Sequence, residues 1–187
     1  AVNAQSGLLI PVGDAVPAGV SPGSLAIAPS GQFAFVVDTL IDGVWTFSID
    51  AATGALTNLN PSEPVPAGAF PDAIAIDRTG RFAYVVNSGS NTISMFAVNA
   101  FTGSLTPTGT AVAAGLRPTS IAIDATGRFA YVTNATDNSL SAYAIDAAVG
   151  TLRALGAAVP TGEGPRYVAV EPNGKFAHVM DPEGNKL

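Results

Sequence analysis

Cysteine is absent from this chain of 187 residues, histidine occurs once, and lysine and arginine together number only 8. Without cysteine there can be no disulfide framework, no thiolate zinc site and no cysteine nucleophile. The formal net charge of −6 argues against a nucleic-acid partner, because such binding depends on basic side chains that neutralise phosphates. No apolar run approaches the roughly 18 residues that a membrane helix requires, so we expect no insertion into a membrane.

Glycine and proline are plentiful, with 20 and 14 residues, and both recur at fixed distances along the chain. A glycine stands two residues before a phenylalanine at Gly31, Gly80, Gly127 and Gly174. A proline stands nine residues before each of these glycines, at Pro22, Pro71, Pro118 and Pro165. Self-similarity with a period of 47 to 49 residues indicates a repeat architecture.

The third repeat has the pattern of four short strands, here called A to D. Residues 119–124 are a nearly continuous apolar run, which is typical of a strand A that is buried on both faces. Asp124 and Gly127 then suit the first and fourth positions of a type I turn. Strand B is expected over residues 128–133, strand C over residues 140–146, and a more variable strand D from residue 151 to about residue 159.

Four short antiparallel strands in a unit of this length are typical of a blade of a β-propeller. We therefore predict an all-β propeller segment of about four repeats, with a different stacked β-array as the alternative. The expected boundaries are residues 1–17 for the end of a preceding blade, 18–66, 67–114 and 115–161 for three blades, and 162–187 for the first half of another.

Both ends of the sequence align with the inside of a repeat: residues 1–7 match residues 97–103, and Leu187 matches Leu140. Because an open arc leaves apolar blade faces uncovered, we weigh a part of a seven-bladed ring, which we prefer, against a closed four-bladed ring and against two copies that form eight blades. Gly7 to about Val12 should then pair with a strand C from missing sequence or from another copy. A four-bladed ring would place Ala1 within about 14 Å of Leu187.

The most specific motif ends strand B. It is Tyr-Val-Thr-Asn at residues 131–134, with variants at residues 84–87, 35–38 and 178–181. This motif resembles the YVTN-repeat and lactonase superfamily of β-propellers, and residues 164–179 are similar to blades of 6-phosphogluconolactonase-type enzymes. The resemblance implies a seven-bladed ring and hydrolysis of a sugar lactone. The chain departs from the pattern at Tyr167, where those blades often have histidine, and at Asp181-Pro182, which replaces Asn-Glu.

Candidate ligand-binding residues gather on one face, because in a propeller the loops before strand A and after strand B emerge together beside the central channel. They are Arg117, Arg166 and Glu163 at the head of strand A, and Asp38, Asn87, Asn134 and Asp181 at the end of strand B. Arg117 and Arg166, taken as one repeat apart, would direct two guanidinium groups into one funnel, which suits a carboxylate or a phosphate. Alternatively, each arginine caps its own strand or pairs with an aspartate of a neighbouring blade.

Other residue patterns favour structural roles. The recurring Asn and Asp side chains can end strands by hydrogen-bonding nearby backbone. His178 would be the obvious general base, but it takes the place of Tyr131, Tyr84 and Phe35, which favours packing, and it has no identifiable nucleophile or orienting partner. Asp38 and Asp42 share a loop without the spacing of a calcium site, so we expect no metal ion and no cofactor.

Two functions fit these features. The preferred hypothesis is a non-catalytic propeller module that binds a protein or a small anionic ligand at the channel face, or serves as a scaffold. The near identity of the repeats and the scarcity of titratable residues outside them favour it. The alternative is a lactone hydrolase in which Arg117 and Arg166 hold the anion and Glu163 or His178 assists proton transfer. Low lysine content and the absence of cysteine slightly favour an exported or cell-surface protein.

Overall fold

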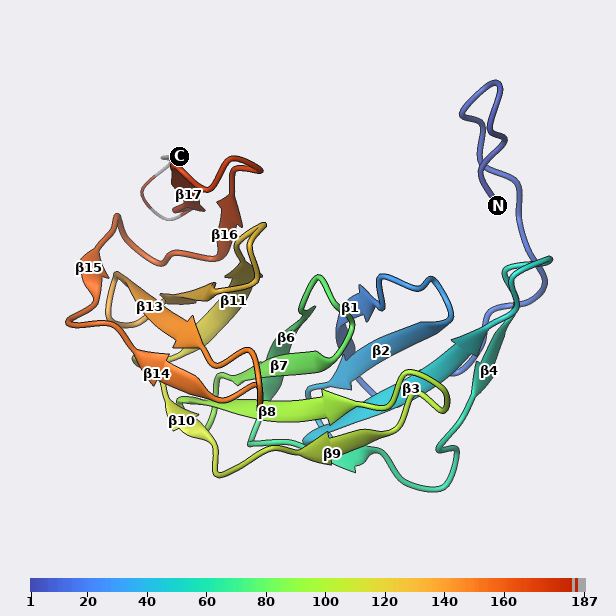
Figure 1. Ribbon diagram of the computed structural model, residues 1–187, viewed down its shortest axis with the longest axis horizontal. Helices are drawn as coiled ribbons and strands as arrows, with labels where there is room; N and C mark the ends of the chain where they lie inside the picture. Colours follow the sequence, from blue (N-terminus) through green and yellow to red (C-terminus); the bar gives the residue numbers. More distant parts are fainter. Residues whose placement is uncertain (183, 185–187) are drawn as a thin grey trace.

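The computed structural model describes residues 1–182 and residue 184. In this part of the chain, three sheets of five strands and one pair of strands follow one another along an open arc (Figure 1). The first strand of each sheet lies on the inner side of the arc, beside the first strand of the next sheet. The chain is therefore a segment of a β-propeller, with the sheets as blades. None of the described residues forms a helix long and apolar enough to cross a membrane.

The strands have these bounds. Blade 1 consists of β1 (Pro22–Ile27), β2 (Phe33–Asp38), β3 (Gly43–Ile49), β4 (Leu56–Asn58) and β5 (Val65–Pro66). Blade 2 consists of β6 (Pro71–Ile76), β7 (Phe82–Asn87), β8 (Thr92–Val98), β9 (Leu105–Pro107) and β10 (Val112–Ala113). Blade 3 consists of β11 (Pro118–Ile123), β12 (Phe129–Asn134), β13 (Ser139–Ile145), β14 (Leu152–Ala154) and β15 (Val159–Pro160). Blade 4 contains β16 (Tyr167–Val170) and β17 (Ala177–Met180).

The turn between the first two strands of blade 3 confirms the predicted reverse turn. The Asp124 carboxylate accepts hydrogen bonds from the N–H groups of Arg128 at 2.9 Å and Phe129 at 2.8 Å. Gly127 has a φ of +71°, which glycine adopts without a steric penalty. Burial alone would raise the pKa of Asp124, but these bonds and those from Thr126 lower it below the ordinary value of 3.8. The ionised Asp124 carboxylate therefore stabilises the turn.

The outer edge of each complete blade differs from the single strand D that the repeat predicts. In blade 3, β14 and β15 pair with the two ends of β13, and residues 155–158 leave the sheet between them. Gly156 in this stretch has a φ of +69°, which a regular strand does not allow. The prediction of one continuous strand over residues 151–159 is therefore wrong.

The hydrophobic core lies between neighbouring blades. Phe35 of β2 packs in one buried cluster with Val85 of β7 and Phe96 of β8. On the other face of blade 2, Tyr84 of β7 packs in a second cluster with Val132 of β12. Successive residues of a strand point to opposite faces of the sheet, so β7 contributes to both clusters. Blade 2 is therefore stabilised by burial against both of its neighbours.

The strand D expected at Gly7 to about Val12 would pair with a strand C from outside this chain, so that pairing stays a prediction. Among the described residues the N-terminal segment makes a single isolated bridge, between Val2 and Leu9. A strand D needs a strand C beside it to satisfy its backbone groups, and only residues 1 and 2 of this chain align with that strand C. The predicted distance between Ala1 and Leu187 lies outside the described residues.

Two buried tyrosines provide a matched test of this core. The Tyr84 hydroxyl is buried without a hydrogen-bond partner among the described residues, whereas the Tyr143 hydroxyl donates to the carbonyl oxygen of Ala113 at 3.0 Å. We expect Tyr143→Phe to lower the free energy of unfolding by about 1 kcal/mol, because a buried hydrogen bond is lost. We expect Tyr84→Phe to leave that free energy unchanged or to raise it, since Phe35 already fills the equivalent position.

Equilibrium unfolding in urea measures both changes. The Tyr84 variant is the control for removal of a hydroxyl group from a buried ring. Equal losses of stability in the two variants would contradict this account of the core.

Candidate functional site

The inner strands line a cavity on the channel side of the arc. Its volume is about 440 Å³, within the range of roughly 300 to 1,000 Å³ that is typical of small-molecule sites. Polar groups from all four blades reach it, including Ser24, Asp72, Thr119 and Tyr167. Asp72 is the charged residue among the described residues that line this cavity. We take the cavity as the candidate site.

A recurring break in strand pairing positions the polar side chains of this cavity. The residue after the repeat's proline is left out of the pairing between β6 and β7, where it is Asp72, and between β11 and β12, where it is Thr119. Such a β-bulge changes the direction in which a side chain points. The corresponding residue in blade 4, after Pro165, is Arg166. Sequence analysis missed Asp72, and its position after the repeated proline is the signal that could have found it.

Charge and burial act against each other at Asp72. Burial raises the pKa of its carboxyl group above the ordinary value of 3.8, and the positive charges of Arg117 and Arg166 oppose that rise. Both arginines are exposed, and neither forms an ion pair in the part of the chain that the structure describes. The half-buried Asp72 carboxyl group therefore lies within the electrostatic influence of two exposed guanidinium groups, although neither arginine lines the cavity.

A loop of the preceding blade holds Arg117 in place. The Arg117 backbone has a φ of +54°, and its N–H group donates to the Oδ1 atom of Asn91 at 2.7 Å. The same contact recurs from Phe70 to Asp42 at 2.8 Å and from Gly164 to Asn138 at 2.9 Å. This hydrogen bond thus recurs in several blades, and in blade 3 the residue that it holds is a cation.

The structure corrects the predicted equivalence of the two arginines. Arg117 precedes Pro118, whereas Arg166 follows Pro165, so they occupy different positions of the repeat. They nevertheless act on the same carboxyl group, Asp72. That both bind one ligand remains a prediction.

The four candidate residues at the ends of the second strands lie inside the blades. Asp38, Asn87 and Asn134 are fully buried and Asp181 nearly so. The Asn134 Oδ1 atom accepts a hydrogen bond from the Gly115 N–H at 3.0 Å, and its Nδ2 atom donates to the hydroxyls of Ser139 and Ser141 at 3.0 and 2.9 Å. One amide thus ties the loop before β11 to β13. The expected ligand contacts of these four residues remain a prediction.

Aspartate takes the place of asparagine in blades 1 and 4. Asp38 accepts hydrogen bonds from the Val20 N–H at 2.6 Å and from Nε1 of Trp45 at 3.4 Å. Burial disfavours its ionised form, but its hydrogen bonds together lower the pKa of Asp38 below 3.8. Asp181 accepts a bond from the Gly162 N–H at 2.9 Å. Trp45 therefore supplies the contact to β3 that serine hydroxyls make in blade 3.

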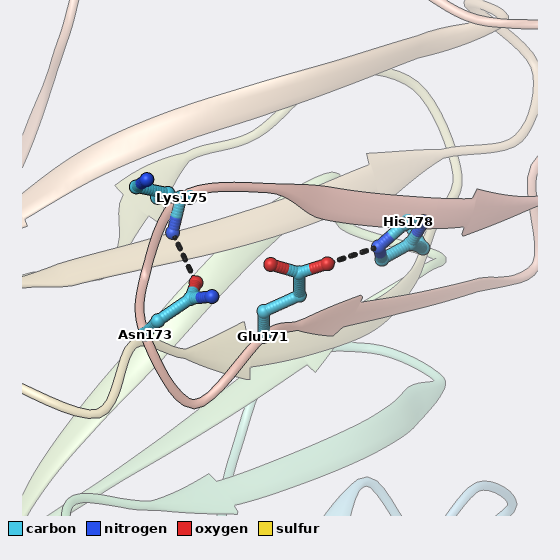
Figure 2. A network of polar contacts seen from close by, with 4 residues as sticks. All are labelled: Glu171, Asn173, Lys175 and His178. Carbon is cyan, nitrogen blue, oxygen red and sulfur yellow. Dashed lines mark hydrogen bonds and ion pairs between the residues drawn. The ribbon is translucent and has the colours of Figure 1, made fainter.

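Glu163 and His178 do not line the channel cavity. His178 lies on β17, its side chain is 52% exposed, and its Nε2 atom is 3.2 Å from Oε1 of Glu171 (Figure 2). The equivalent Tyr84 is buried because β8 and blade 3 cover it, whereas no strand after β17 belongs to the described residues. Among the residues that the structure describes, no group of three or more acidic or histidine side chains could hold a metal ion.

The close approach of the loop to Asn134 gives a test of the buried amide. A Cβ atom at Gly115 would lie 2.5 Å from Cγ of Asn134, whereas at Gly109 its nearest neighbour would be 3.9 Å away. We expect Gly115→Ala to lower the free energy of unfolding by about 1 to 3 kcal/mol, because the loop must move away from the amide. Gly109→Ala is the matched control and should change stability by less than about 0.5 kcal/mol. Similar urea midpoints for the two variants would refute this role of Gly115.

The raised pKa of Asp72 predicts a pH-dependent effect of Asp72→Asn. An acid whose pKa is higher in the folded state stabilises the fold while protonated, and this contribution is lost as the pH rises through the folded pKa. Asp72→Asn should therefore raise the melting temperature at pH 7, and the gain should shrink as the pH falls toward 3.8.

Asp50 provides the opposite case for the same measurement. Hydrogen bonds from Thr53 and Ala52 lower the pKa of this exposed carboxyl group. Asp50→Asn should therefore lower the melting temperature at pH 7. A lower melting temperature for Asp72→Asn at pH 7 would contradict the burial of that carboxyl group.

Comparison with known proteins agrees with this architecture. The family described as Lactonase, 7-bladed beta-propeller matches residues 3–119 and, in an overlapping match, residues 27–187. A candidate 6-phosphogluconolactonase of Bacteroides uniformis has a TM-score of 0.79 at 22% identity, over 88% of this chain and 48% of that one. The periplasmic gluconolactonase PpgL of Pseudomonas aeruginosa has a TM-score of 0.74 at 28% identity, over 87% of this chain and 47% of that one.

The chain thus spans about half the length of these solved structures. A comparison with curated proteins gave no match. Since the family match extends over nearly the whole sequence and the blades repeat the same fold, the chain belongs to the lactonase family of seven-bladed β-propellers.

Proposed function

We propose that the channel end around Asp72 is a binding site for a small anionic ligand that also carries hydroxyl groups. The observation that carries this proposal is that Arg117 and Arg166, from two blades, act on one half-buried carboxyl group beside a cavity of about 440 Å³. Guanidinium groups without a carboxylate partner suit a carboxylate or a phosphate, which they can bind through two parallel hydrogen bonds.

Asp72 gives the proposed site its selectivity. A simple anion would be repelled by the ionised Asp72 carboxylate, whereas a ligand that also has a hydroxyl group can donate a hydrogen bond to it. The hydroxyl of Thr119 donates to the carbonyl oxygen of Pro165 at 2.9 Å and lies 3.0 Å from the Thr133 hydroxyl, which can donate to it, so one lone pair is left to accept from a ligand. Both side chains thus favour a ligand with several hydroxyl donors next to its charge.

The proposal concerns a protein that acts as a binding module or scaffold, in an exported or cell-surface setting. The remaining blades of the ring would come from sequence outside this chain or from another copy. A channel that other blades enclose would exclude more water and strengthen the ionic contacts of the arginines.

Hydrolysis of a sugar lactone is the second candidate, and the environment of Asp72 is the observation that favours it. A carboxyl group that lines a cavity and whose pKa is raised by burial is a candidate for proton transfer. The likeness to the Pseudomonas gluconolactonase supports this candidate. Asp72 would then be the proton-transfer group, in place of the expected Glu163 or His178, which do not line the cavity.

One pair of measurements on the full-length protein separates these functions. Calorimetric titration with gluconate should show binding that Arg166→Ala weakens at least tenfold, because charge-assisted hydrogen bonds are lost. Arg153→Ala, at an exposed arginine of β14, removes the same charge far from the channel and should change affinity less than twofold. Hydrolysis of glucono-δ-lactone should not exceed the spontaneous rate.

Lactone turnover that Asp72→Asn abolishes would instead establish the hydrolase. Absence of gluconate binding, or equal weakening by Arg166→Ala and Arg153→Ala, would overturn the binding proposal.

A further inference from the structure

A second cavity lies at the opposite end of the blades from Asp72, between the turns that follow β6 and β11. It encloses about 110 Å³, and its lining includes Arg78, Arg81 and Arg128. In Figure 1 these turns are the connections that leave the arrowheads of β6 and β11. Three arginines at one small cavity are unusual in a chain with a net charge of −6.

Contacts between blades 2 and 3 hold two of these arginines in place. The Nη1 atom of Arg78 donates to the carbonyl oxygen of Ala125 at 2.9 Å, and the Nη2 atom of Arg81 donates to that of Ala148 at 3.3 Å. The guanidinium carbon of Arg81 also lies 5.0 Å from the centre of the Phe82 ring, within the range of a cation–π contact. Because each guanidinium has five N–H donors, most of these donors are left for a ligand.

No carboxylate forms an ion pair with Arg78, Arg81 or Arg128 among residues 1–182 and 184. Asp77 also lines the cavity, but its carboxylate accepts hydrogen bonds from the N–H groups of Arg81 at 2.8 Å and Phe82 at 2.7 Å. Asp77 is therefore engaged by its own turn, as Asp124 is in the next blade. Two positive charges remain in excess among the charged residues of the lining.

The arginines come together at one junction of the arc. Blade 1 has Pro29 and Gln32 at the positions of Arg78 and Arg81, and blade 3 has Ala125 at the position of Arg78. Blade 3 has Arg128 and blade 4 has Lys175 at the position of Arg81, so a cation recurs there, whereas blade 4 has Pro172 at the position of Arg78. Arg78 therefore departs from the repeat and adds a third positive charge where Arg81 and Arg128 line the same cavity.

We propose that this cavity binds a phosphate group, either as free inorganic phosphate or as part of a phosphorylated small molecule. A volume of about 110 Å³ equals that of a few water molecules at about 30 Å³ each, and falls below the range of about 300 to 1,000 Å³ for whole ligands. It therefore suits a single charged group. Guanidinium groups that are already oriented match the oxygen atoms of a phosphate. The site is independent of the channel site.

Calorimetric titration of the full-length protein with inorganic phosphate, at about 0.15 M ionic strength, tests this site. The variants are Arg78→Ala and Arg81→Gln, which introduce residues that the fold already carries at the same positions, Ala125 and Gln32. Each should weaken phosphate binding at least tenfold. The control Lys175→Gln removes a charge from the equivalent position of blade 4, outside the cavity, and should change affinity less than twofold.

A second titration with a hexose phosphate identifies the source of the phosphate group. Tighter binding than that of inorganic phosphate indicates a phosphorylated ligand, equal or weaker binding indicates the free anion, and both results support the site. Arg153→Ala, at an arginine that lines neither cavity, should leave phosphate binding unchanged. Absence of phosphate binding at about 10 mM, or equal weakening by Lys175→Gln and Arg81→Gln, would overturn the proposal.

Discussion

The buried polar side chain at the end of the second strand organises each blade and the loop above it. Asn134 connects the Gly115 N–H to the Ser139 and Ser141 hydroxyls, so a loop and the second and third strands of the blade meet at one amide. An unpaired amide in this place would be costly, because it has no access to water. The path of residues 115–117 depends on that bond, and Arg117 reaches the channel from the end of this path. The charged face of the propeller thus depends on an interaction inside the blade.

The repeat predicts the first three strands of a blade. In blade 3 the first three strands are expected over residues 119–124, 128–133 and 140–146, and β11, β12 and β13 lie within one residue of these bounds. Strand A was also expected to be buried on both faces, but β11 is only partly buried because it lines the channel. The outer strand is harder to predict, since its sequence is more variable and the positive φ of Gly156 interrupts it.

The site is less predictable than the fold, because its geometry depends on pairing that the sequence does not display. Arg117 and Arg166 stand out as charges at the head of strand A. Asp72 does not stand out, because whether its side chain faces the channel depends on the bulge after Pro71. The shift in its pKa depends further on burial and on Arg117 and Arg166, which come from other blades. Such contacts between repeats cannot be derived from one repeat alone.

Departures from the repeat are the positions where this fold can acquire a ligand at little cost in stability. A position that every blade shares, such as Gly115, has a packing role, and a change there disturbs contacts within and between blades. A position that differs between blades has no such common role: Asp72 matches Thr119, and Arg78 matches Pro29. A ligand lacks the repeat symmetry of the ring, so residues that recognise it should break that symmetry. Asp72 and Arg78 do so at opposite ends of the blades, so the two proposed anion sites would lie apart on one arc.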